Sequence, residues 1–342
     1  MEEVMNSFNF LTAPDVPTAI QLTNNQLSAF IAGGTNLLDL WKYNLVNPTA
    51  LIDINQLAAL SEFRELENGG FRLGAAVKNA ETAYHPIIES RYPLLSRAIL
   101  AGASAQIRNM ASNGGNLLQR TRCYYFYDHQ VPCNKRIPGS GCPARDGYNR
   151  MHAILGASEA CIAVFPSDMC VALAALEARI NITGGDGERS LAFSDFHRLP
   201  GERPDLDNNL KPGELITSID LPAKGFPLNY SYLKLRDRHS YAFALVSVAT
   251  ALEMDGNTIK EARIALGGVA HKPWRSLEAE EFLREKTACR ENFAAAADII
   301  LQGAVGLEYN RFKIKLAKNA IIRNGMMAID PDSQLPGAQP SL

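Results

Sequence analysis

Residues 27–54, LSAFIAGGTNLLDLWKYNLVNPTALIDI, establish the architecture of the N-terminal region. Apolar residues 29–32 predict a strand, the glycines after them a turn, residues 37–41 a helix and residues 50–54 a second strand. In such a unit the backbone N–H groups of the turn and the helix N-terminus can bind a pyrophosphate. The turn matches neither G-x-G-x-x-G nor G-x-x-x-x-G-K-[ST], so a plain turn stays open as an alternative.

A second segment, PLLSRAILAGASAQIRNMASNGGNLL at residues 93–118, also combines an apolar stretch with a glycine-rich turn. We expect a helix after Pro93 and another glycine-rich turn at residues 113–116. Two such loops in one domain favour a large dinucleotide over a single phosphate, whereas a type I′ hairpin turn is the alternative for the second loop.

Four cysteines lie in one loop rich in Gly, Pro and Arg: Cys123, Cys133, Cys142 and Cys161. They are separated by 9, 8 and 18 residues, whereas zinc sites usually hold cysteines in closely spaced pairs. Thiolates are the usual ligands of [4Fe–4S] clusters, so the loop predicts an iron–sulfur site, with zinc or unconnected cysteines as alternatives. Six cysteines in 342 residues are too few for a disulfide scaffold.

The remaining candidate ligands fit the loop less well. His129 and His152 could replace a sulfur ligand, but four cysteines make this unnecessary. Cys170 falls in an Ala/Leu-rich helix and Cys289 in a charged helix, so both are expected to be buried apolar residues or free thiols.

The second half of the chain contains two regions with different sequence patterns. Residues 161–182, CIAVFPSDMCVALAALEARINI, predict a short strand, a helix that begins at Ser167 and Asp168, and another strand. From about Phe226, strands precede helices expected over 277–287, 291–304 and 310–324, which predicts a separate α+β domain with its joint near 222–227. The tail after Ile329 is expected to be mobile.

The bulk properties exclude several classes. The formal charge is −2 and 46% of residues are hydrophobic, which fits a globular chain without a basic field for nucleic acid. No apolar run is long enough to span a membrane, and the acidic start MEEVMNSFNFLTAPD predicts no signal peptide. Positive charge concentrates only near the cysteine loop, at Arg120, Arg122, Lys135, Arg136, Arg145 and Arg150. These cations would balance the charge of a cluster or form a docking surface, and the alternative is a solvated loop.

Five motifs occur together in a specific order: AGGTNLL at 32–38, QIRNMASNGGNLL at 106–118, PSD at 166–168, ELITSIDLP at 214–222 and YLKLRDRHSYAFALVSVA at 232–249. Over about residues 5–330 they closely resemble the FAD-binding subunit of the molybdenum hydroxylases, the xanthine dehydrogenase and aldehyde oxidoreductase family. This resemblance implies an α+β fold with a vanillyl-alcohol-oxidase (PCMH)-type FAD-binding domain of two subdomains, over 1–223 and split near 55–60, a small α+β C-terminal domain over 227–330 and a flexible tail over 331–342.

Residues 119–165 depart from most members, whose second glycine loop leads almost directly into the Ser-Asp pair. The insertion resembles that of a cluster-bearing branch, which includes the flavin subunits of hydroxybenzoyl-CoA reductase and of the bacterial periplasmic aldehyde oxidoreductase. This resemblance implies that Cys123, Cys133, Cys142 and Cys161 bind a [4Fe–4S] cluster.

The resemblance also implies contacts to FAD. The first loop, residues 30–36, would wrap the pyrophosphate, and residues 111–118 would line the second loop. Asp168 would bind the ribose or adenine side, Ile216 would pack on the adenine and Lys234 would lie near the isoalloxazine. The alternative for Lys234 is a strand lysine that reaches solvent, and Tyr232 and Tyr241 either shield the ring or simply pack. The implied contact residues are Phe30, Ile31, Ala32, Gly33, Gly34, Thr35, Asn36, Ala111, Ser112, Gly115, Asn116, Leu118, Asp168, Ile216 and Lys234.

By the same resemblance, the chain is an electron-transfer subunit rather than a complete enzyme. Substrate would be oxidised at a molybdenum cofactor on a large partner, and electrons would pass through [2Fe–2S] clusters on a small partner to this FAD and then to an external acceptor. The aromatic run at 124–127 and the nearby cations would form an interface, or the aromatics would cover the cluster. The alternatives are a self-contained FAD oxidase or dehydrogenase and a zinc-binding scaffold. We expect a periplasmic complex exported on a partner's signal, or else a cytoplasmic one.

Overall fold

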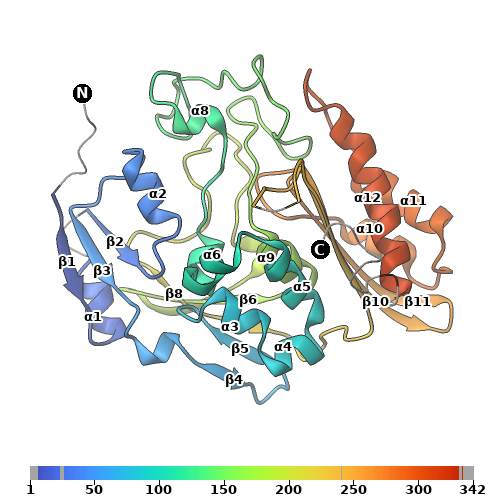
Figure 1. Cartoon of the computed structure of the whole chain (residues 1–342), viewed down its shortest axis with the longest axis horizontal. Coiled ribbons are helices and arrows are strands. Elements are labelled where there is room, and N and C mark those ends of the chain that lie inside the picture. The colour runs from blue at the N-terminus through green and yellow to red at the C-terminus, as the bar shows by residue number, and fades with distance from the viewer. Residues whose placement is uncertain (1–6, 24–26, 240, 331–332, 334–342) are drawn as a thin grey trace.

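The computed structural model describes residues 7–23, 27–239, 241–330 and 333. Most of the tail over 331–342 therefore lies outside the described residues. The described residues form three sheets, with the N-terminal sheet at one side of the molecule and the C-terminal helices at the other (Figure 1).

The first sheet is the strand–turn–helix–strand unit that the sequence predicts. Its three strands are parallel in the order β1-β3-β2, with bounds β1 Asn9–Thr12, β2 Ser28–Ile31 and β3 Ala50–Asp53. The helices are α1 Val16–Gln21 and α2 Leu37–Lys42, and a short helix η1 Ala58–Leu60 follows. The buried residues Ala19, Ile52 and Leu57 belong to a small core of their own, which also includes Leu215 from the next sheet.

The second sheet is antiparallel, in the order β4-β5-β8-β6-β7. Its strands are β4 Phe63–Glu65, β5 Phe71–Gly74, β6 Arg179–Gly184, β7 Gly187–Ala192 and β8 Leu215–Leu221. The helices of this region are α3 Asn79–Ala83, α4 Pro86–Arg91, α5 Pro93–Ala101, α6 Ala105–Met110, α7 Asn113–Leu117, α9 Asp168–Ala175 and η2 Phe193–Asp195. The main core joins this sheet to α5, α9 and the inner face of the third sheet.

The third sheet is antiparallel in the order β12-β11-β10-β9, with bounds β9 Asn229–Leu235, β10 Val246–Asp255, β11 Thr258–Gly267 and β12 Trp274–Arg275. Helices α10 Leu277–Leu283, α11 Arg290–Ile300 and α12 Phe312–Ile329 pack on it and form a separate core around Phe293. Strands followed by helices are what the sequence predicts for this region, although the helices end a few residues from the predicted limits.

Two local predictions are wrong. Residues 113–116 are the first turn of α7 rather than a free turn or a hairpin, because the Ser112 side chain caps the helix by accepting a hydrogen bond from Gly115 N. Residues 161–165 form no strand, since their backbone groups bond to separate irregular segments: Ala153 N donates to Ile162 O and Phe165 N donates to Ala270 O.

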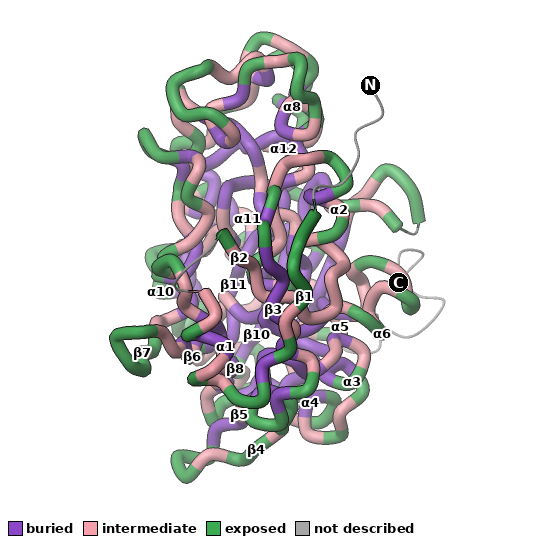
Figure 2. The backbone as a smooth tube through the Cα atoms, turned by 90° about the vertical axis from the view of Figure 1, so that its left-hand side faces the viewer, coloured by how far each residue is buried: buried purple, intermediate pink, exposed green. Residues whose placement is uncertain are grey.

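The insertion at 119–165 lies above the centre of the molecule in Figure 1, and its only regular element is helix α8 Tyr124–Tyr127. In the turned view its outer turns are exposed while purple, buried stretches run through its inside (Figure 2). No helix in the described part of the chain combines the length and apolar character that crossing a membrane requires.

Candidate functional site

A large cleft opens where the first loop, the second loop, α9 and β9 meet. Its volume is about 710 Å³, within the range of sites that bind cofactors and other small molecules. Of the residues implied to contact FAD, the cleft is lined by Thr35, Asn36, Ala111, Gly115, Asn116, Asp168 and Lys234.

The first loop is fixed by its two glycines. Gly34 has φ +69°, which disfavours a side chain, and a Cβ on Gly33 would lie 1.9 Å from the carbonyl oxygen of Met110. Gly33 therefore lets the first loop pack directly on the end of α6 in the second loop. The two loops form one continuous wall of the cleft.

Asn36 presents a free donor in this wall. Its Oδ1 accepts a hydrogen bond from Arg120 N at 3.0 Å, whereas its buried Nδ2 has no partner among the described residues. A buried polar atom without a partner is unusual in a folded protein. A phosphate oxygen or another acceptor of a bound cofactor would satisfy it.

The second loop is held by a network of asparagines. Asn113 Oδ1 accepts from Asn79 Nδ2 at 3.1 Å and from Thr82 Oγ1 at 3.0 Å, and Asn116 Nδ2 donates to Asn79 Oδ1 at 2.7 Å. Asn116 Oδ1 accepts from Ser167 Oγ at 2.6 Å, which ties the loop to the start of α9. These buried contacts position Gly115 and Asn116 against the cleft.

Asp168 and Lys234 form a buried ion pair at the floor of the cleft. Lys234 Nζ lies 2.8 Å from Asp168 Oδ2 and 3.1 Å from the carbonyl oxygen of Ala101, and Tyr232 OH donates to Asp168 Oδ1 at 2.6 Å. Burial and the neighbouring carboxylate raise the pKa of Tyr232 well above its usual range, so the phenol keeps its proton. Lys234 is thus a paired lysine of the interior, not a strand lysine that reaches solvent.

The pair also constrains the roles implied for its members. Because the two side chains touch, they occupy one point of the cleft, whereas the ribose and the isoalloxazine of an extended FAD lie at different points. Tyr232 is occupied with Asp168, while Tyr241 is exposed and lines the cleft mouth.

The other implied residues lie behind the cleft or beside it. Ser112 acts as the α7 cap, Leu118 is exposed just after that helix, and Ile216 is buried in the main core. The residues of the implied set that do not line the cleft are Phe30, Ile31, Ala32, Gly33, Gly34, Ser112, Leu118 and Ile216. They support the cleft through the backbone and the packing of the loops.

Sequence reasoning missed part of the cleft. Arg122, Met151 and Phe243 line it, and Arg122 Nη1 is paired with Asp39 Oδ2 at 2.6 Å. The position of Arg122 directly before Cys123 was the available signal. It shows that the insertion forms a wall of the cleft as well as the cysteine site.

The four cysteines of the insertion gather in one place, which we call the cysteine cage: Cys123, Cys133, Cys142 and Cys161. They share an apolar cluster with Phe126, and the space they border is small, about 10 Å³. Three of the cysteines are buried and Cys142 is partly exposed. In the described part of the chain no three His, Cys, Asp or Glu side chains converge on a single metal ion.

The thiols of the cage differ in acidity. Burial raises the pKa of Cys123 to about 12. The Cys161 thiol donates to the sulfur of Cys142, which lowers the pKa of Cys142 to about 6 and raises that of Cys161. One sulfur of this pair is therefore ready to be a thiolate, the form that binds metals.

A buried cation borders the cage. Lys135 lines it, and its Nζ lies 2.5 Å from Asp207 Oδ1 and 2.6 Å from the carbonyl oxygen of Pro204. Arg120 pairs with the other oxygen of Asp207 at 2.7 Å. Burial opposes ionisation of Asp207, but Lys135 and Arg120 together hold its pKa below the usual range. Two cations share one carboxylate, which leaves an excess of positive charge beside the sulfurs.

The donor set fits a sulfur-ligated anionic group. Four thiols and a cation line the cage, and none of the described residues that line it carries a carboxylate. The remaining candidates lie elsewhere: Cys170 is fully buried in α9, with a pKa raised by burial to about 12, and Cys289 precedes α11. His129 is engaged with the Tyr43 carbonyl oxygen.

Only one aromatic residue of the 124–127 run is exposed. Phe126 is buried in the cage cluster, Tyr125 OH accepts from Tyr148 N at 2.8 Å, and Tyr127 OH donates to Asp39 Oδ2 at 3.1 Å. Tyr124 alone faces solvent. The run therefore mainly covers the cage, as one of the two sequence interpretations expects.

The cations around the insertion are also used internally. Arg145 pairs with Glu159, and Arg136 donates to the carbonyl oxygens of residues 125 and 126. Arg150 pairs with Asp237 on the C-terminal side. These contacts connect segments within the insertion and connect the insertion to the C-terminal side.

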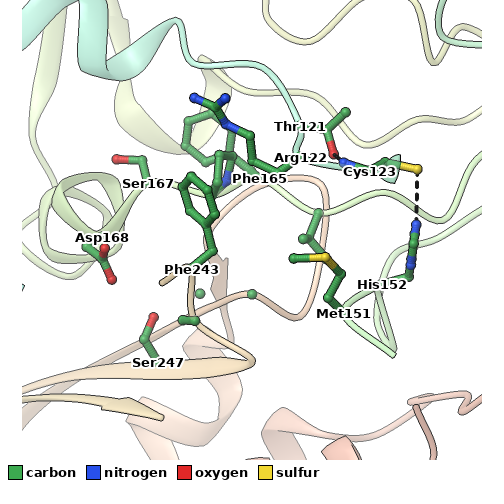
Figure 3. Close-up of a pocket in the computed structure, with 15 residues that line it drawn as sticks. Thr121, Arg122, Cys123, Met151, His152, Phe165, Ser167, Asp168, Phe243 and Ser247 are labelled. Carbon is green, nitrogen blue, oxygen red and sulfur yellow. Dashed lines mark hydrogen bonds between the residues drawn. The ribbon is translucent and has the colours of Figure 1, made fainter. Parts of the chain in front are cut away.

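The cage and the cleft share a wall. A small cavity of about 20 Å³ lies between them, with Cys123 and His152 at one end and Asp168 at the other (Figure 3). Arg122 and Met151 line both this cavity and the cleft. Arg122 directly precedes Cys123 and Met151 directly precedes His152, so the backbone connects the cage and the cleft without an intervening layer.

The chain was compared with protein families and curated proteins. The family model for the FAD binding domain in molybdopterin dehydrogenase matches residues 6–224, and that for the CO dehydrogenase flavoprotein C-terminal domain matches residues 231–318. The chain is 49% identical to the aldehyde oxidoreductase FAD-binding subunit PaoB of Escherichia coli (strain K12), over 85% of this chain and 88% of that protein. It is 28% identical to the glyceraldehyde dehydrogenase medium chain of Sulfolobus acidocaldarius, over 80% of each.

Solved structures show the same fold. Quinoline 2-oxidoreductase from Pseudomonas putida 86 is similar with a TM-score of 0.73 and 24% identity, over 96% of this chain and 99% of that chain. Carbon monoxide dehydrogenase from Hydrogenophaga pseudoflava is similar with a TM-score of 0.74 and 23% identity, over 95% and 98%. The two-part α+β architecture predicted from the sequence is thereby confirmed.

Proposed function

The chain belongs to the FAD-binding subunits of the molybdenum hydroxylases, an oxidoreductase family, and on that premise we propose that it is the electron-transfer subunit of a heterotrimeric aldehyde-oxidising complex. The observation that carries the proposal is the shared wall between a cofactor cleft and a cage of four cysteines. A chain that places two redox sites side by side is suited to pass electrons between partners.

The cleft would hold FAD, which exchanges one or two electrons when bound. The Asn36 Nδ2 donor and the backbone of Gly115 would face its polar groups. The Asp168 and Lys234 pair would meet it at a single point, as a unit that is neutral overall and fixed in direction. This replaces separate contacts of the two residues at opposite ends of FAD.

The cage would hold a [4Fe–4S] cluster through Cys123, Cys133, Cys142 and Cys161. Four thiolates carry negative charge, and the positive excess of Lys135 and Arg120 over Asp207 would offset it in the interior. Because the present space between the thiols is small, they would move apart slightly to admit the cluster.

Substrate oxidation would take place on a partner. The three carboxylates that line the cleft are all in ion pairs: Asp39 with Arg122, Asp168 with Lys234 and Asp237 with Arg150. A carboxylate held in such a pair is a poor general base. This favours a relay, which receives electrons from a large molybdenum subunit through a small [2Fe–2S] subunit and delivers them to an external acceptor.

The test is purification of the tagged chain from its host, with assays of FAD, iron and molybdenum. We expect copurification with a large molybdenum subunit and a small iron–sulfur subunit, and negligible aldehyde oxidation by the chain alone. Oxidation by the isolated chain at ordinary enzyme rates, roughly 1–10³ per second, would contradict the relay and favour a self-contained flavoenzyme.

We further propose that the complex is periplasmic and is exported already folded on a partner's twin-arginine signal. The proposal rests on the resemblance of the insertion at 119–165 to that of the flavin subunit of the bacterial periplasmic aldehyde oxidoreductase. Fractionation of host cells tests it: recovery of the chain only with cytoplasmic proteins would refute it.

A further inference from the structure

We propose that His152 is a positioning residue for the cysteine cage: its Nε2–H donates to Cys123 Sγ and raises the reduction potential of the bound cluster. The inference rests on the proposed function, since it needs a cluster in the cage. It concerns a residue outside the ligand set, and it assigns that residue a role in electron transfer rather than in binding iron.

The contact is direct and buried. His152 Nε2 lies 3.1 Å from Cys123 Sγ, as the dashed line in Figure 3 marks, and the side chain is almost fully buried. A hydrogen bond to sulfur of this length inside a protein is shielded from competing water. The ring is therefore committed to Cys123.

The hydrogen-bonding pattern fixes which nitrogen carries the proton. A ligand thiolate can only accept, so the ring nitrogen that faces it must donate. Nδ1 is buried and has no partner among the described residues, and a buried N–H without an acceptor is rarely tolerated. The tautomer with its proton on Nε2 satisfies both conditions.

The backbone of His152 is clamped from the C-terminal domain. Its carbonyl oxygen accepts from Lys313 Nζ at 2.7 Å and from Asn310 Nδ2 at 3.3 Å, and its N–H donates to Asn149 O at 3.0 Å. These bonds fix the backbone of His152, and the almost complete burial of its side chain restricts rotation of the ring away from the sulfur. A ligand hydrogen bond held in this way is pre-organised rather than formed on demand.

The consequence for the cluster follows from charge. Reduction adds negative charge to the cluster and its sulfurs, so a donor aimed at a sulfur stabilises the reduced state more than the oxidised state. His152 should therefore raise the potential. Since Met151 and Arg122 continue from His152 and Cys123 into the cleft wall, this is the side of the cage that faces the flavin.

The experiment compares the purified complex with variants His152→Leu and His152→Gln, and with His197→Leu as a control. His197 is another buried histidine, whose Nε2–H donates to Leu117 O among the rings of Phe165 and Phe196, and it lies outside the cage. Iron content and the paramagnetic resonance signal of the reduced cluster report whether the cluster is present. A redox titration of that signal then gives the midpoint potential.

We expect His152→Leu to keep its iron, to show a lower midpoint potential and to lose an exchangeable-proton coupling from the resonance spectrum. His152→Gln, which can still donate, should lie between it and the unaltered complex, and His197→Leu should leave the midpoint potential unchanged. An unchanged potential in His152→Leu overturns the inference. Loss of iron in both His152 variants also overturns it, because His152 would then be needed to hold the cluster.

Absence of any cluster from the unaltered complex refutes the proposed function itself, and the inference with it. A cluster present with the expected ligands but insensitive to His152 refutes the inference alone. If His152→Leu does not assemble, the comparison of His152→Gln with the unaltered complex decides, since a changed proton coupling and a shifted potential are required there too.

Discussion

Replacing Asp168 by Asn should destabilise the protein strongly, because it leaves a buried charge without its partner. The side chain of Lys234 is 2% exposed and that of Asp168 9%. Among the described residues, the acceptor that Lys234 Nζ retains besides the carboxylate is the Ala101 carbonyl oxygen at 3.1 Å. Removing one partner of a buried pair typically costs about 3–5 kcal/mol. Asn keeps the size of Asp and can still accept from Tyr232, so we expect about 3 kcal/mol.

A double-mutant cycle isolates the pair from the packing around it. Asp168→Asn, Lys234→Met and the combined variant would be unfolded with urea, and the free energies of unfolding compared. The combined variant removes both charges, so it should be less destabilised than the sum of the single variants by about 2 kcal/mol. Met fills nearly the same space as the stem of Lys, which keeps the cavity term small.

The same variants separate a structural pair from a cofactor-binding one. FAD stabilises a protein that binds it only when folded, so added FAD should raise the urea midpoint of the unaltered protein more than that of Asp168→Asn. Additivity of the two single variants within about 0.5 kcal/mol would refute the buried pair. Equal stabilisation of both proteins by FAD would show that the pair does not touch the cofactor.

Three further outcomes follow from the structure. Gly34→Val should lose FAD from the purified protein, because φ is +69° and the new Cβ would lie 3.0 Å from Leu38 Cδ1. The control Gly303→Val, with φ +76° and no atom within 4 Å of its Cβ, should keep FAD. Equal FAD absorbance of the two variants would contradict this prediction. Ser substitutions at Cys123, Cys133, Cys142 and Cys161 should each lose iron by elemental analysis, while Cys170→Ala and Cys289→Ala keep it; iron loss in Cys170→Ala with retention in Cys161→Ser would show a different ligand set. Burial lowers the pKa of His197 to about 4, below the unfolded value of about 6.5. The contribution of His197 to the free energy of unfolding is therefore complete above pH 6.5, and about 3 kcal/mol of it is lost as the pH falls to 4. In urea unfolding, His197→Gln should lose less free energy of unfolding over this pH range, and parallel curves of that free energy against pH for the two proteins would disprove the prediction.

Local sequence was sufficient where local contacts decide the structure. The first loop is a strand, a glycine turn and a helix within a few residues of one another, and its prediction is confirmed. The turn predicted at residues 113–116 was wrong because contacts with residues distant in the sequence decide the structure there. Asn-Gly-Gly-Asn has low helix propensity, but the Ser112 cap and the buried bonds of Asn113 to Asn79 and Thr82 hold it as the first turn of α7.

For the site residues, the sequence indicated which residues take part but not their distant partners. Residue types and their resemblance to a family indicated Asp168 and Lys234, but not that they would pair, since 66 residues and the joint between the domains separate them. The cysteines were found as a set, and the structure brings them together. The cations around them were indicated as a patch, whereas their partners, such as Asp207 for Arg120 and Lys135, come from other parts of the chain.

The C-terminal domain has a structural role that its sequence did not suggest. Buried Lys313 of α12 donates to the carbonyl oxygens of His152 and Gly268 at 2.7 and 2.6 Å, and Val305 N donates to Ile154 O at 2.8 Å. Two of these bonds, at the carbonyl oxygens of His152 and Ile154, satisfy the backbone of an irregular insertion that has almost no secondary structure of its own. The insertion is therefore held by several neighbours: α2 through Asp39, the segment at 204–207 through Lys135 and Arg120, and the C-terminal domain through Lys313. A cage built in this way depends on the whole chain being folded.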